Sequence, residues 1–511
     1  MNKYTEKHFV VTPAQMKAAE GECEHRGTSC AVLMENVGAK IAERLDEMLS
    51  LSGKTVVILA GSGNNGGDGF ALARRVSERG ARAEIVIAGA MTKTELAKDS
   101  YQRNIPFYSS VTSYESNPDA VFALLDTADI IADCVYGTGF HGELSEGAAR
   151  LFDYCNNLEC FKCSADIASG CNALDGEADN SAFSADCTFA LGAVKTGQLY
   201  APCSEKSGEI ILLDIGISPE CYSGGCSAVL CDEELLRLFP KRKRISHKGT
   251  FGRLLNVAGS ESCIGAAWLS TNAALRTGAG LVTLASVNTV TACVSVNLHE
   301  CVLLPLGAEK NIKAAEIDTI LSAAKGATAI SVGCGMGNSG DTYAVVDALI
   351  KNTDCPIVID ADGINSLAPH INGLRDNTNR LILTPHPKEF CRISGYELSY
   401  VLKNKLKAAA DFAREHGVHL ILKDAYSVYA APDGFTAVNM SGNAALAKGG
   451  SGDTLTGTVA GLLAQGMTIP DAVRPGMYLF GSAAELAAKS RGMCGILPSE
   501  LPELYPYILK G

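Results

Sequence analysis

The chain has 511 residues, of which 47% are hydrophobic and 20% charged, so it is long enough for several globular domains with large cores. Its formal net charge of -12 argues against general binding to nucleic acid or to an anionic membrane. No apolar run is long enough to cross a bilayer, and no signal peptide opens the chain, so its nineteen cysteines are expected as reduced thiols in a cytoplasm.

Short apolar runs alternate with amphipathic segments along the chain, which is typical of repeated βαβ units with parallel strands. The first set of predicted strands is Thr55–Ala60, Ala83–Ala88, Ile130–Cys134, Cys163–Ile167, Cys187–Leu191 and Ile210–Ile215, with a helix over Phe70–Arg79. The second set is Leu254–Ala258, Val282–Ser286, Ala329–Val332, Pro356–Asp360, Leu381–Thr384 and Val418–Lys423. A segment with several glycines and prolines, Gly216–Arg244, separates the two sets. We therefore expect an α/β fold with two domains, residues 1–225 and 226–511.

The first half carries a glycine-rich segment, Gly61–Gly69, directly between the strand Thr55–Ala60 and the helix expected to begin near Phe70. Ligands of doubly wound sheets bind at this kind of crossover, where glycines let backbone N–H groups approach an anion. No Lys-Ser or Lys-Thr pair follows, and the glycine spacing departs from the dinucleotide-binding fingerprint. The segment predicts an anion-binding loop without assigning it to either motif.

Further polar groups follow later strands of the first half. They are Asp133, Gly137–Glu143, Asp166–Gly170 and Lys195–Gly197. Each taken alone is explained as a helix cap or a turn residue. Because the carboxyl ends of parallel strands meet at one edge of a sheet, their repetition favours a shared site in a Rossmann-like three-layer αβα domain.

The second half contains the run Lys448–Asp453 ahead of an apolar helix predicted over Thr454–Leu463. Glycines at 449, 450 and 452 allow backbone N–H groups to face an anion, and the helix adds the positive end of its dipole. With Asp453 placed at the cap to take a proton from a hydroxyl, the run predicts a phosphoryl-transfer site. A glycine-rich turn with an ordinary capping aspartate is the alternative.

These motifs resemble two known families in order and spacing. Asn64–Gly69, Asp133, Gly137–Gly139, Asp166–Gly170 and Lys195 to Gly197 resemble the NAD(P)H-hydrate epimerase domain of the YjeF N-terminal family. Gly249–Gly259, Gly333–Gly337, Asp360–Asn365, Thr384–Pro387 and Gly442–Asp453 resemble the ADP- or ATP-dependent NAD(P)H-hydrate dehydratase of the ribokinase-like superfamily. Together the two cover nearly all of the chain. The resemblance implies a bifunctional repair enzyme with a ribokinase-like αβα second domain.

For the first domain, the resemblance implies interconversion of the two epimers of hydrated NADH or NADPH, with Asp166 as the acid/base group. Substrate contacts carry over to Asn64, Asn65, Gly66, Gly67, Asp68, Gly137, Thr138, Gly139, Phe140, His141, Gly142, Glu143, Asp166 and Lys195. A potassium ion carries over to Asn65, Asp133 and Ser169, whose oxygen ligands suit a large hard cation.

For the second domain, the resemblance implies dehydration of one epimer with ADP or ATP as phosphoryl donor, together with Mg²⁺, and Asp453 as the base. Substrate contacts carry over to Ala266, Gly335, His386 and Asp453. Nucleotide contacts carry over to Lys423, Asp424, Ala425, Tyr426, Ser427, Gly449, Gly450, Ser451 and Gly452. Before the resemblance is counted, a structural or capping role for His386 is an even alternative.

Three departures from the family pattern stand near these sites: Asp424 replaces a glycine, Lys388 replaces a glycine, and Ala168 replaces a proline. The charge of Asp424 is the one that bears on nucleotide binding. Two other functions stay open: a ribokinase-like kinase for a vitamin or sugar hydroxyl, and a first half that serves as a binding or scaffolding module. The donor nucleotide and the preference between NADH and NADPH hydrates stay undecided, and exposed sheet edges make a homo-oligomer plausible.

Overall fold

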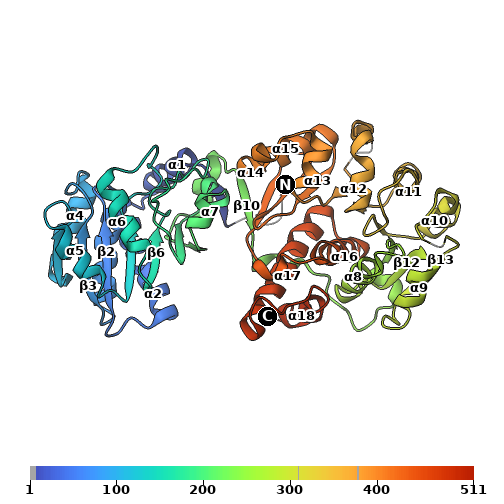
Figure 1. The fold of residues 1–511 in the computed structure, drawn as a ribbon, viewed down its shortest axis with the longest axis horizontal. Coiled ribbons are helices and arrows are strands. Elements are labelled where there is room, and N and C mark those ends of the chain that lie inside the picture. Colours follow the sequence, from blue (N-terminus) through green and yellow to red (C-terminus); the bar gives the residue numbers. More distant parts are fainter. Residues whose placement is uncertain (1–6, 309, 377–378, 511) are drawn as a thin grey trace. The chain divides into compact units, whose positions relative to one another are not determined.

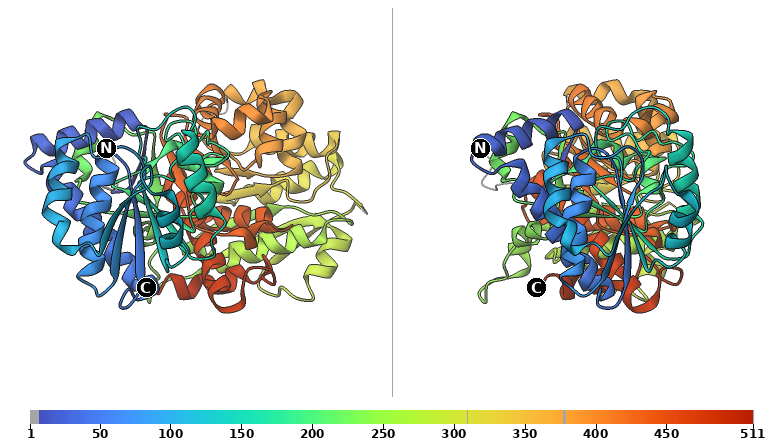
Figure 2. Two further views of the ribbon diagram at one scale, coloured as in Figure 1. Left: turned by 60° about the vertical axis from the view of Figure 1, so that its left-hand side comes forward. Right: turned by 90° about the vertical axis from the view of Figure 1, so that its left-hand side faces the viewer.

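A computed structural model describes residues 7–308, 310–376 and 379–510. The chain divides into two compact units, Met1–Val229 and Leu230–Gly511. Each unit is an α/β structure with helices on both faces of a central sheet (Figures 1 and 2). The predicted fold class is confirmed, and the division falls inside the segment predicted to join the domains.

The first unit contains a seven-stranded sheet in the order β4-β3-β2-β5-β6-β7-β9, in which every paired neighbour is parallel. Its strands are β2 (Thr55–Ala60), β3 (Arg82–Ile87), β4 (Ser110–Ser113), β5 (Ile130–Cys134), β6 (Phe161–Ala165), β7 (Cys187–Leu191) and β9 (Glu209–Leu213). Two short strands of the unit are β1 (Phe9–Val11) and β8 (Val194–Lys195), and β10 (Ala228–Cys231) crosses the division between the units. From β2 the chain continues to β3 and β4 on one side of the sheet, and from β5 it continues to β6, β7 and β9 on the other. The topological switch point therefore lies between β2 and β5.

Two helical layers cover this sheet. The helices of the unit are α1 (Pro13–His25), α2 (Cys30–Leu49), α3 (Asn64–Ser77), α4 (Glu95–Asn104), α5 (Pro118–Leu125), α6 (Glu146–Asn156) and α7 (Cys203–Lys206). Helices α2, α3 and α4 pack on one another, and α5 and α6 pack on the opposite face through a core that includes Val57, Leu59 and Phe152. Figure 2 shows the strands between these two layers.

The glycine-rich segment after β2 differs from its prediction. Helix α3 begins at Asn64 rather than near Phe70, so most of the predicted loop forms the first turns of a helix. A Cβ atom at Gly66 would lie 2.0 Å from the carbonyl oxygen of Gly61, and one at Gly67 would lie 2.5 Å from Cε of Met34. These glycines therefore permit close packing of the helix, and none of Gly61, Gly66 or Gly67 has a positive φ.

The second unit contains the strands β11 (Arg253–Val257), β12 (Leu281–Val287), β13 (Val302–Leu306), β14 (Ala329–Val332), β15 (Ile357–Ile359), β16 (Leu381–Leu383), β17 (His419–Leu422), β18 (Ser427–Ala430) and β19 (Thr436–Asn439). They follow the order β13-β12-β11-β14-β15-β16-β17-β18-β19. Pairs from β13 to β17 are parallel, whereas β17, β18 and β19 are antiparallel. The sequence did not predict this final hairpin.

The helices of the second unit are α8 (Ile264–Arg276), α9 (Asn288–Val294), α10 (Ile317–Ala324), α11 (Gly340–Asn352), α12 (Asp362–Leu367), α13 (Pro387–Ser394), α14 (Leu398–Lys403), α15 (Lys405–His416), α16 (Ser451–Ala464), α17 (Ile469–Arg491) and α18 (Leu501–Ile508). Helices α12, α13 and α15 lie on one face of the sheet, and α8, α16 and α17 lie on the other (Figure 1). Glycines allow α16 to approach α8 closely, because a Cβ at Gly457 would lie 2.1 Å from the carbonyl oxygen of Ser270. This contact holds α16 closely against α8.

None of the helices in the described part of the chain combines the length and apolar character that a membrane span requires.

Candidate active sites

Asp166 lies directly after β6, at the carboxyl edge of the first sheet. Its Oδ1 is 2.6 Å from Nζ of Lys195, and its Oδ2 accepts a hydrogen bond from the Thr138 N–H at 3.1 Å. Asp166 has a φ of +70°, a left-handed conformation that is costly for a residue other than glycine. The Gln198 side chain donates to the Asp166 carbonyl at 3.0 Å and helps to hold this geometry. The structure thus brings together Asp166, Thr138 and Lys195 from three separate sequence motifs.

Two further carboxylates share the electrostatic environment of this pair. Burial raises the pKa of Asp68 well above its usual range, and the negative charges of Asp166 and Glu20 add to that effect. The pKa of Glu20 on α1 is raised by burial and then by Asp166. Lys195 is completely buried, and its positive charge lowers the pKa of both Glu20 and Asp68. Glu20 was missed by the sequence analysis, because it precedes every motif and nothing in its local sequence marks it.

The residues predicted to hold potassium lie at the ends of three neighbouring elements. Asp133 is fully buried, and its carboxylate accepts hydrogen bonds from the backbone and hydroxyl of Ser169 at 2.8 and 2.6 Å. Asn65 is buried, and within the described residues neither polar atom of its side chain has a partner. A Cβ at Gly137 would lie 3.6 Å from Cγ of Asn65 and 3.1 Å from Oδ2 of Asp166. An oxygen ligand left unsatisfied beside buried carboxylates fits a cation.

The loop Gly137–Glu143 is only partly drawn into this cluster. Gly137 and Thr138 contact Asp166, but His141, Gly142 and Glu143 are exposed. Among the described residues, the ring of His141 bonds only to the Gly139 carbonyl, at 2.9 Å. The far end of the loop is therefore separate from the carboxylates in this structure.

In the second unit, the predicted glycine tract leads into α16. The helix begins at Ser451, and its N-cap is Gly450, which has a φ of +98°. Asp453 is thus the third residue of the helix, and its predicted position at the cap is wrong. The Ser451 hydroxyl is buried without a partner among the described residues, and a Cβ at Gly449 would meet nothing within 4 Å. The tract leaves both an open surface and an unused hydroxyl at the positive end of the helix.

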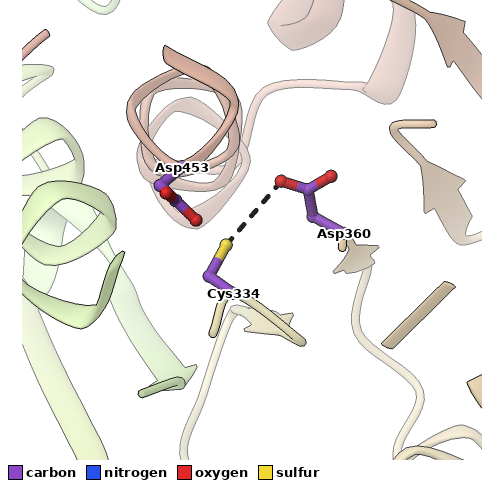
Figure 3. A group of neighbouring side chains, drawn as sticks. All are labelled: Cys334, Asp360 and Asp453. Atoms are coloured by element: carbon purple, nitrogen blue, oxygen red, sulfur yellow. Dashed lines mark hydrogen bonds between the residues drawn. The ribbon is translucent and has the colours of Figure 1, made fainter. Parts of the chain in front are cut away.

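Asp453 lies beside Cys334 and Asp360 (Figure 3), and one ligand-type atom of each lies within 4.8 Å of the others. Asp360 follows β15 and accepts hydrogen bonds from Lys423 at 2.8 Å and from Thr456 of α16 at 2.8 Å. Burial alone would raise the pKa of Asp360, but Lys423 and the hydrogen bonds lower it, so this carboxylate is ionised. Burial, reinforced by the charge of Asp360, raises the pKa of Asp453 to about 6. Asp453 is the carboxylate of this group that is suited to accept a proton.

This pKa predicts the acid limb of the pH profile of the second unit. If Asp453 is the base, as the sequence predicts, it must be ionised to accept a proton, so kcat/KM of the second unit should fall about tenfold for each pH unit below the Asp453 pKa of about 6. Rates measured from pH 5 to 8 at saturating nucleotide test this. A rate that stays constant down to pH 5 would contradict the assignment of Asp453 as the base.

Lys423 forms the opposite wall of this site. A Cβ at Gly452 would lie 3.1 Å from its Nζ, so the glycine tract and the lysine face the same space. Gly335 has a φ of +64°, and a Cβ there would lie 2.9 Å from Cβ of Ala266, so these two predicted substrate contacts are neighbours. His386 caps α13, where its Nδ1 accepts hydrogen bonds from the N–H groups of Lys388 and Glu389 at 3.2 and 3.3 Å. The capping role of His386 is therefore present in the structure, and its substrate contact stays a prediction.

The turn Asp424–Ser427 carries the unusual aspartate. Asp424 forms an ion pair with Lys405, the first residue of α15, at 2.7 Å, and the side chain of Lys405 is only 6% exposed. The Ser427 hydroxyl accepts from the Asp424 N–H at 3.2 Å and donates to its carbonyl at 3.0 Å. The negative charge that the sequence places near a nucleotide is thus compensated by a lysine nineteen residues earlier, which sequence analysis did not find.

Comparison with known proteins covers both units. Residues 30–197 match the model of the YjeF-related protein N-terminus, and residues 254–506 match the model of the NAD(P)H-hydrate dehydratase. The chain is 30% identical to the bifunctional NAD(P)H-hydrate repair enzyme Nnr of Moorella thermoacetica, over 98% of this chain and 97% of that one. The chain belongs to the bifunctional NAD(P)H-hydrate repair enzymes. It is therefore both an NAD(P)H-hydrate epimerase and an ADP- or ATP-dependent NAD(P)H-hydrate dehydratase.

Two solved structures resemble the second unit. A ribokinase-like superfamily protein of Enterococcus faecalis has a TM-score of 0.50 and 22% identity, and it covers 56% of this chain and 96% of its own, which supports the ribokinase-like fold. The ADP/ATP-dependent NAD(P)H-hydrate dehydratase of Bacillus subtilis, co-crystallized with ATP/Mg²⁺, is 31% identical, covers 55% of this chain and 97% of its own, and has a TM-score of 0.48.

Proposed function

We propose that the two reactions of this repair enzyme use the two carboxylate clusters, with Asp453 as the base of the dehydratase and Asp166 as the acid/base group of the epimerase. The observation that supports this division most strongly is the position of Asp453, between the open glycine tract and the ion pair of Lys423 with Asp360. Few arrangements other than phosphoryl transfer need a base, a cation and free backbone N–H groups around one space.

In the dehydratase, Asp453 takes the proton of the ring hydroxyl while the hydroxyl oxygen attacks the terminal phosphorus of ADP or ATP. The bond from that phosphorus to the bridging oxygen breaks, and AMP or ADP leaves. The N–H groups of Gly449–Gly452 and the charge of Lys423 stabilise the transferring phosphoryl group. The lone pair of the ring nitrogen then expels inorganic phosphate, and the adjacent ring carbon gives a proton to water, which restores the dihydropyridine. Mg²⁺ supplies charge neutralisation on the nucleotide phosphates when bound. Ala266, Gly335 and His386 contact the hydrate, and Asp424–Ser427 contact the nucleotide.

In the epimerase, Asp166 moves protons at the hydrated ring, and Lys195 holds its carboxylate in place. Asn64–Asp68 and Gly137–Glu143 hold the remainder of the substrate, with the exposed end of the second loop free to approach it. The strained backbone of Asp166 supports a functional role, because such conformations persist where the surroundings impose them.

Potassium binding by Asn65, Asp133 and Ser169 predicts a pH-dependent stabilisation. Burial raises the pKa of Asp133 from 3.8 to about 6, so the stability that its neutral form provides is present below pH 4 and lost as the pH rises through 6. A bound cation offsets this loss, so KCl should raise Tm more at pH 8 than at pH 5, relative to choline chloride at equal ionic strength. Asp133→Asn should remove the difference. An equal increment at both pH values would contradict the site.

The ion pair of Lys405 with Asp424 predicts a paired effect on nucleotide affinity. Lys405→Met should raise the KM for the nucleotide about 10-fold, because the uncompensated carboxylate then repels phosphate. Lys405→Met with Asp424→Asn should return the KM close to that of the wild type, whereas Asp424→Asn alone should change it little. Steady-state kinetics of the three variants checks this. If the double variant is as poor as Lys405→Met alone, the effect of Lys405 is on packing rather than on charge.

We also propose that the enzyme is cytoplasmic and forms a homo-oligomer. All nineteen cysteines lie within the described residues and all are free thiols, which supports a reducing cytoplasm. A homo-oligomer formed through the sheet edges is testable by light scattering of the purified chain.

Products distinguish this proposal from the kinase alternative. With hydrated NADH and ADP, the repair reaction releases one inorganic phosphate for each NADH, whereas a kinase would accumulate a phosphorylated metabolite. Without nucleotide, chromatography of a single epimer should show conversion to the mixture, which a scaffolding module would not produce.

A further inference from the structure

A cavity of about 600 Å³ lies in the first unit, beside the cluster of Asp166. Asp68, Asp133 and Asp166 are not among its lining residues, and the family resemblance assigns none of the lining residues to substrate. The cavity is lined by Gly61, Ser62, Ala88–Ala90, Lys93, Tyr114, Glu115, Pro118, Val135, Tyr136, Ser145–Ala148 and Arg150. Its volume is in the range of cofactor sites.

The lining residues follow the carboxyl ends of β2, β3, β4 and β5, and Tyr114, Val135 and Ala148 belong to the core on the side of the sheet covered by α5 and α6. Gly61 and Val135 come from the two strands that flank the topological switch point, where doubly wound sheets bind nucleotides. The position of the cavity at this edge is thus what a dinucleotide site requires.

Two short segments connect the cavity to the proposed catalytic cluster. After Tyr136, the chain continues to Gly137 and Thr138, whose N–H donates to Asp166. The Tyr136 N–H itself donates to the Ser169 hydroxyl at 2.8 Å, beside the proposed cation site. On the other side of the switch point, Ser62 precedes α3, which carries Asn65. One elongated ligand can therefore reach both places along the sheet edge.

The charges on the cavity wall identify the chemistry of such a ligand. Lys93 and Arg150 are exposed, and neither has a carboxylate within ion-pair distance among the described residues. The Arg150 guanidinium lies over the Phe122 ring, 5.4 Å from its centroid, which orients it. Glu115 and Glu146 add two acceptors to the same wall. The two carboxylates would repel a bare polyanion. An apolar ligand would leave Lys93, Arg150, Glu115 and Glu146 without partners. A nucleoside phosphate uses both kinds of group, because its phosphate accepts hydrogen bonds and its ribose and base donate them.

We propose that this cavity binds the AMP half of the dinucleotide hydrate, with Lys93 and Arg150 on its phosphate oxygens, while the hydrated nicotinamide lies at Asp166. The assignment rests on the proposed epimerase function and adds Lys93 and Arg150 to the contacts that the family motifs assign to the substrate beyond its ring. It makes the two cations affinity determinants for the dinucleotide rather than catalytic residues.

The test compares hydrated NADH with hydrated reduced nicotinamide mononucleotide, which lacks the AMP half. In Lys93→Ala with Arg150→Ala, the KM of epimerisation should rise roughly 10-fold or more for the dinucleotide, with kcat little changed, and should be unaltered for the mononucleotide. Lys98→Ala, which removes an exposed lysine of α4 outside the cavity, is the matched control. Equal effects on the two substrates, or none on either, would overturn the assignment.

A second variant fills the cavity without removing charge. Gly89 has no positive φ, and a Cβ there would meet nothing within 4 Å, so Gly89→Phe occupies the space without backbone strain. It should abolish AMP binding measured by calorimetry and raise the KM for the dinucleotide alone. Retained AMP binding would overturn the proposal. If the wild type epimerises neither substrate, the proposed epimerase function itself has failed, which is a different result from a selective failure of AMP binding.

Discussion

Asp453→Asn is expected to reduce dehydration by about 10³-fold while leaving epimerisation unchanged. Asparagine keeps the size of the side chain but cannot accept the proton of the ring hydroxyl. The neighbouring pair of Lys423 and Asp360 stays intact, so nucleotide should still bind. The measurement is the rate of NADH formation from the reactive epimer at saturating ADP or ATP.

Asp347→Asn is the control for that experiment. Asp347 lies on the surface of α11, where it pairs with Lys351 at 2.7 Å. It is not one of the residues proposed for phosphoryl transfer. This variant should retain wild-type dehydration. If Asp453→Asn were to keep more than a tenth of the wild-type rate, another group would have to act as the base.

Asp166→Asn is expected to lower epimerisation by about 10²- to 10⁴-fold, the usual contribution of a positioned acid/base group. With a mixture of epimers and excess nucleotide, NADH recovery should then stop when the reactive epimer is consumed. The second unit should work at its normal rate up to that point, which the initial rate measures.

Loss of Asp166 also leaves the buried Lys195 without its nearest counter-charge, so some loss of stability is expected. Unfolding of the variant should therefore be measured in parallel. A folded Asp166→Asn variant that converts the whole mixture would show that Asp166 is not the epimerase residue.

Strand positions and strand-end residues were predictable from the sequence, because apolar runs bounded by polar crossovers define parallel strands. The strands β2, β5, β7 and β14 have the bounds predicted for them. Asp360 follows β15 in the way that Asp166 follows β6, so the same rule that selected Asp166 would have selected it.

Other parts of the sites depend on contacts that the local sequence does not encode. The start of α3 at Asn64 depends on glycines that pack against Met34 and Gly61, and local propensity favoured a loop there. The pairing of Lys405 with Asp424 and the approach of Glu20 to Asp166 join separate elements through the tertiary fold. The hairpin of β18 and β19 was missed although Pro432-Asp433-Gly434, a typical turn sequence, lies between its two short runs.

The central claim is that one chain carries both repair activities in separate units. The most direct measurement incubates the purified wild type with both epimers of hydrated NADH, Mg²⁺ and K⁺, supplies ADP or ATP in turn, and follows NADH absorbance and inorganic phosphate. Complete conversion of both epimers, with one phosphate released for each NADH, is the predicted result. No recovery with either nucleotide, or a phosphorylated product that persists, would contradict the account.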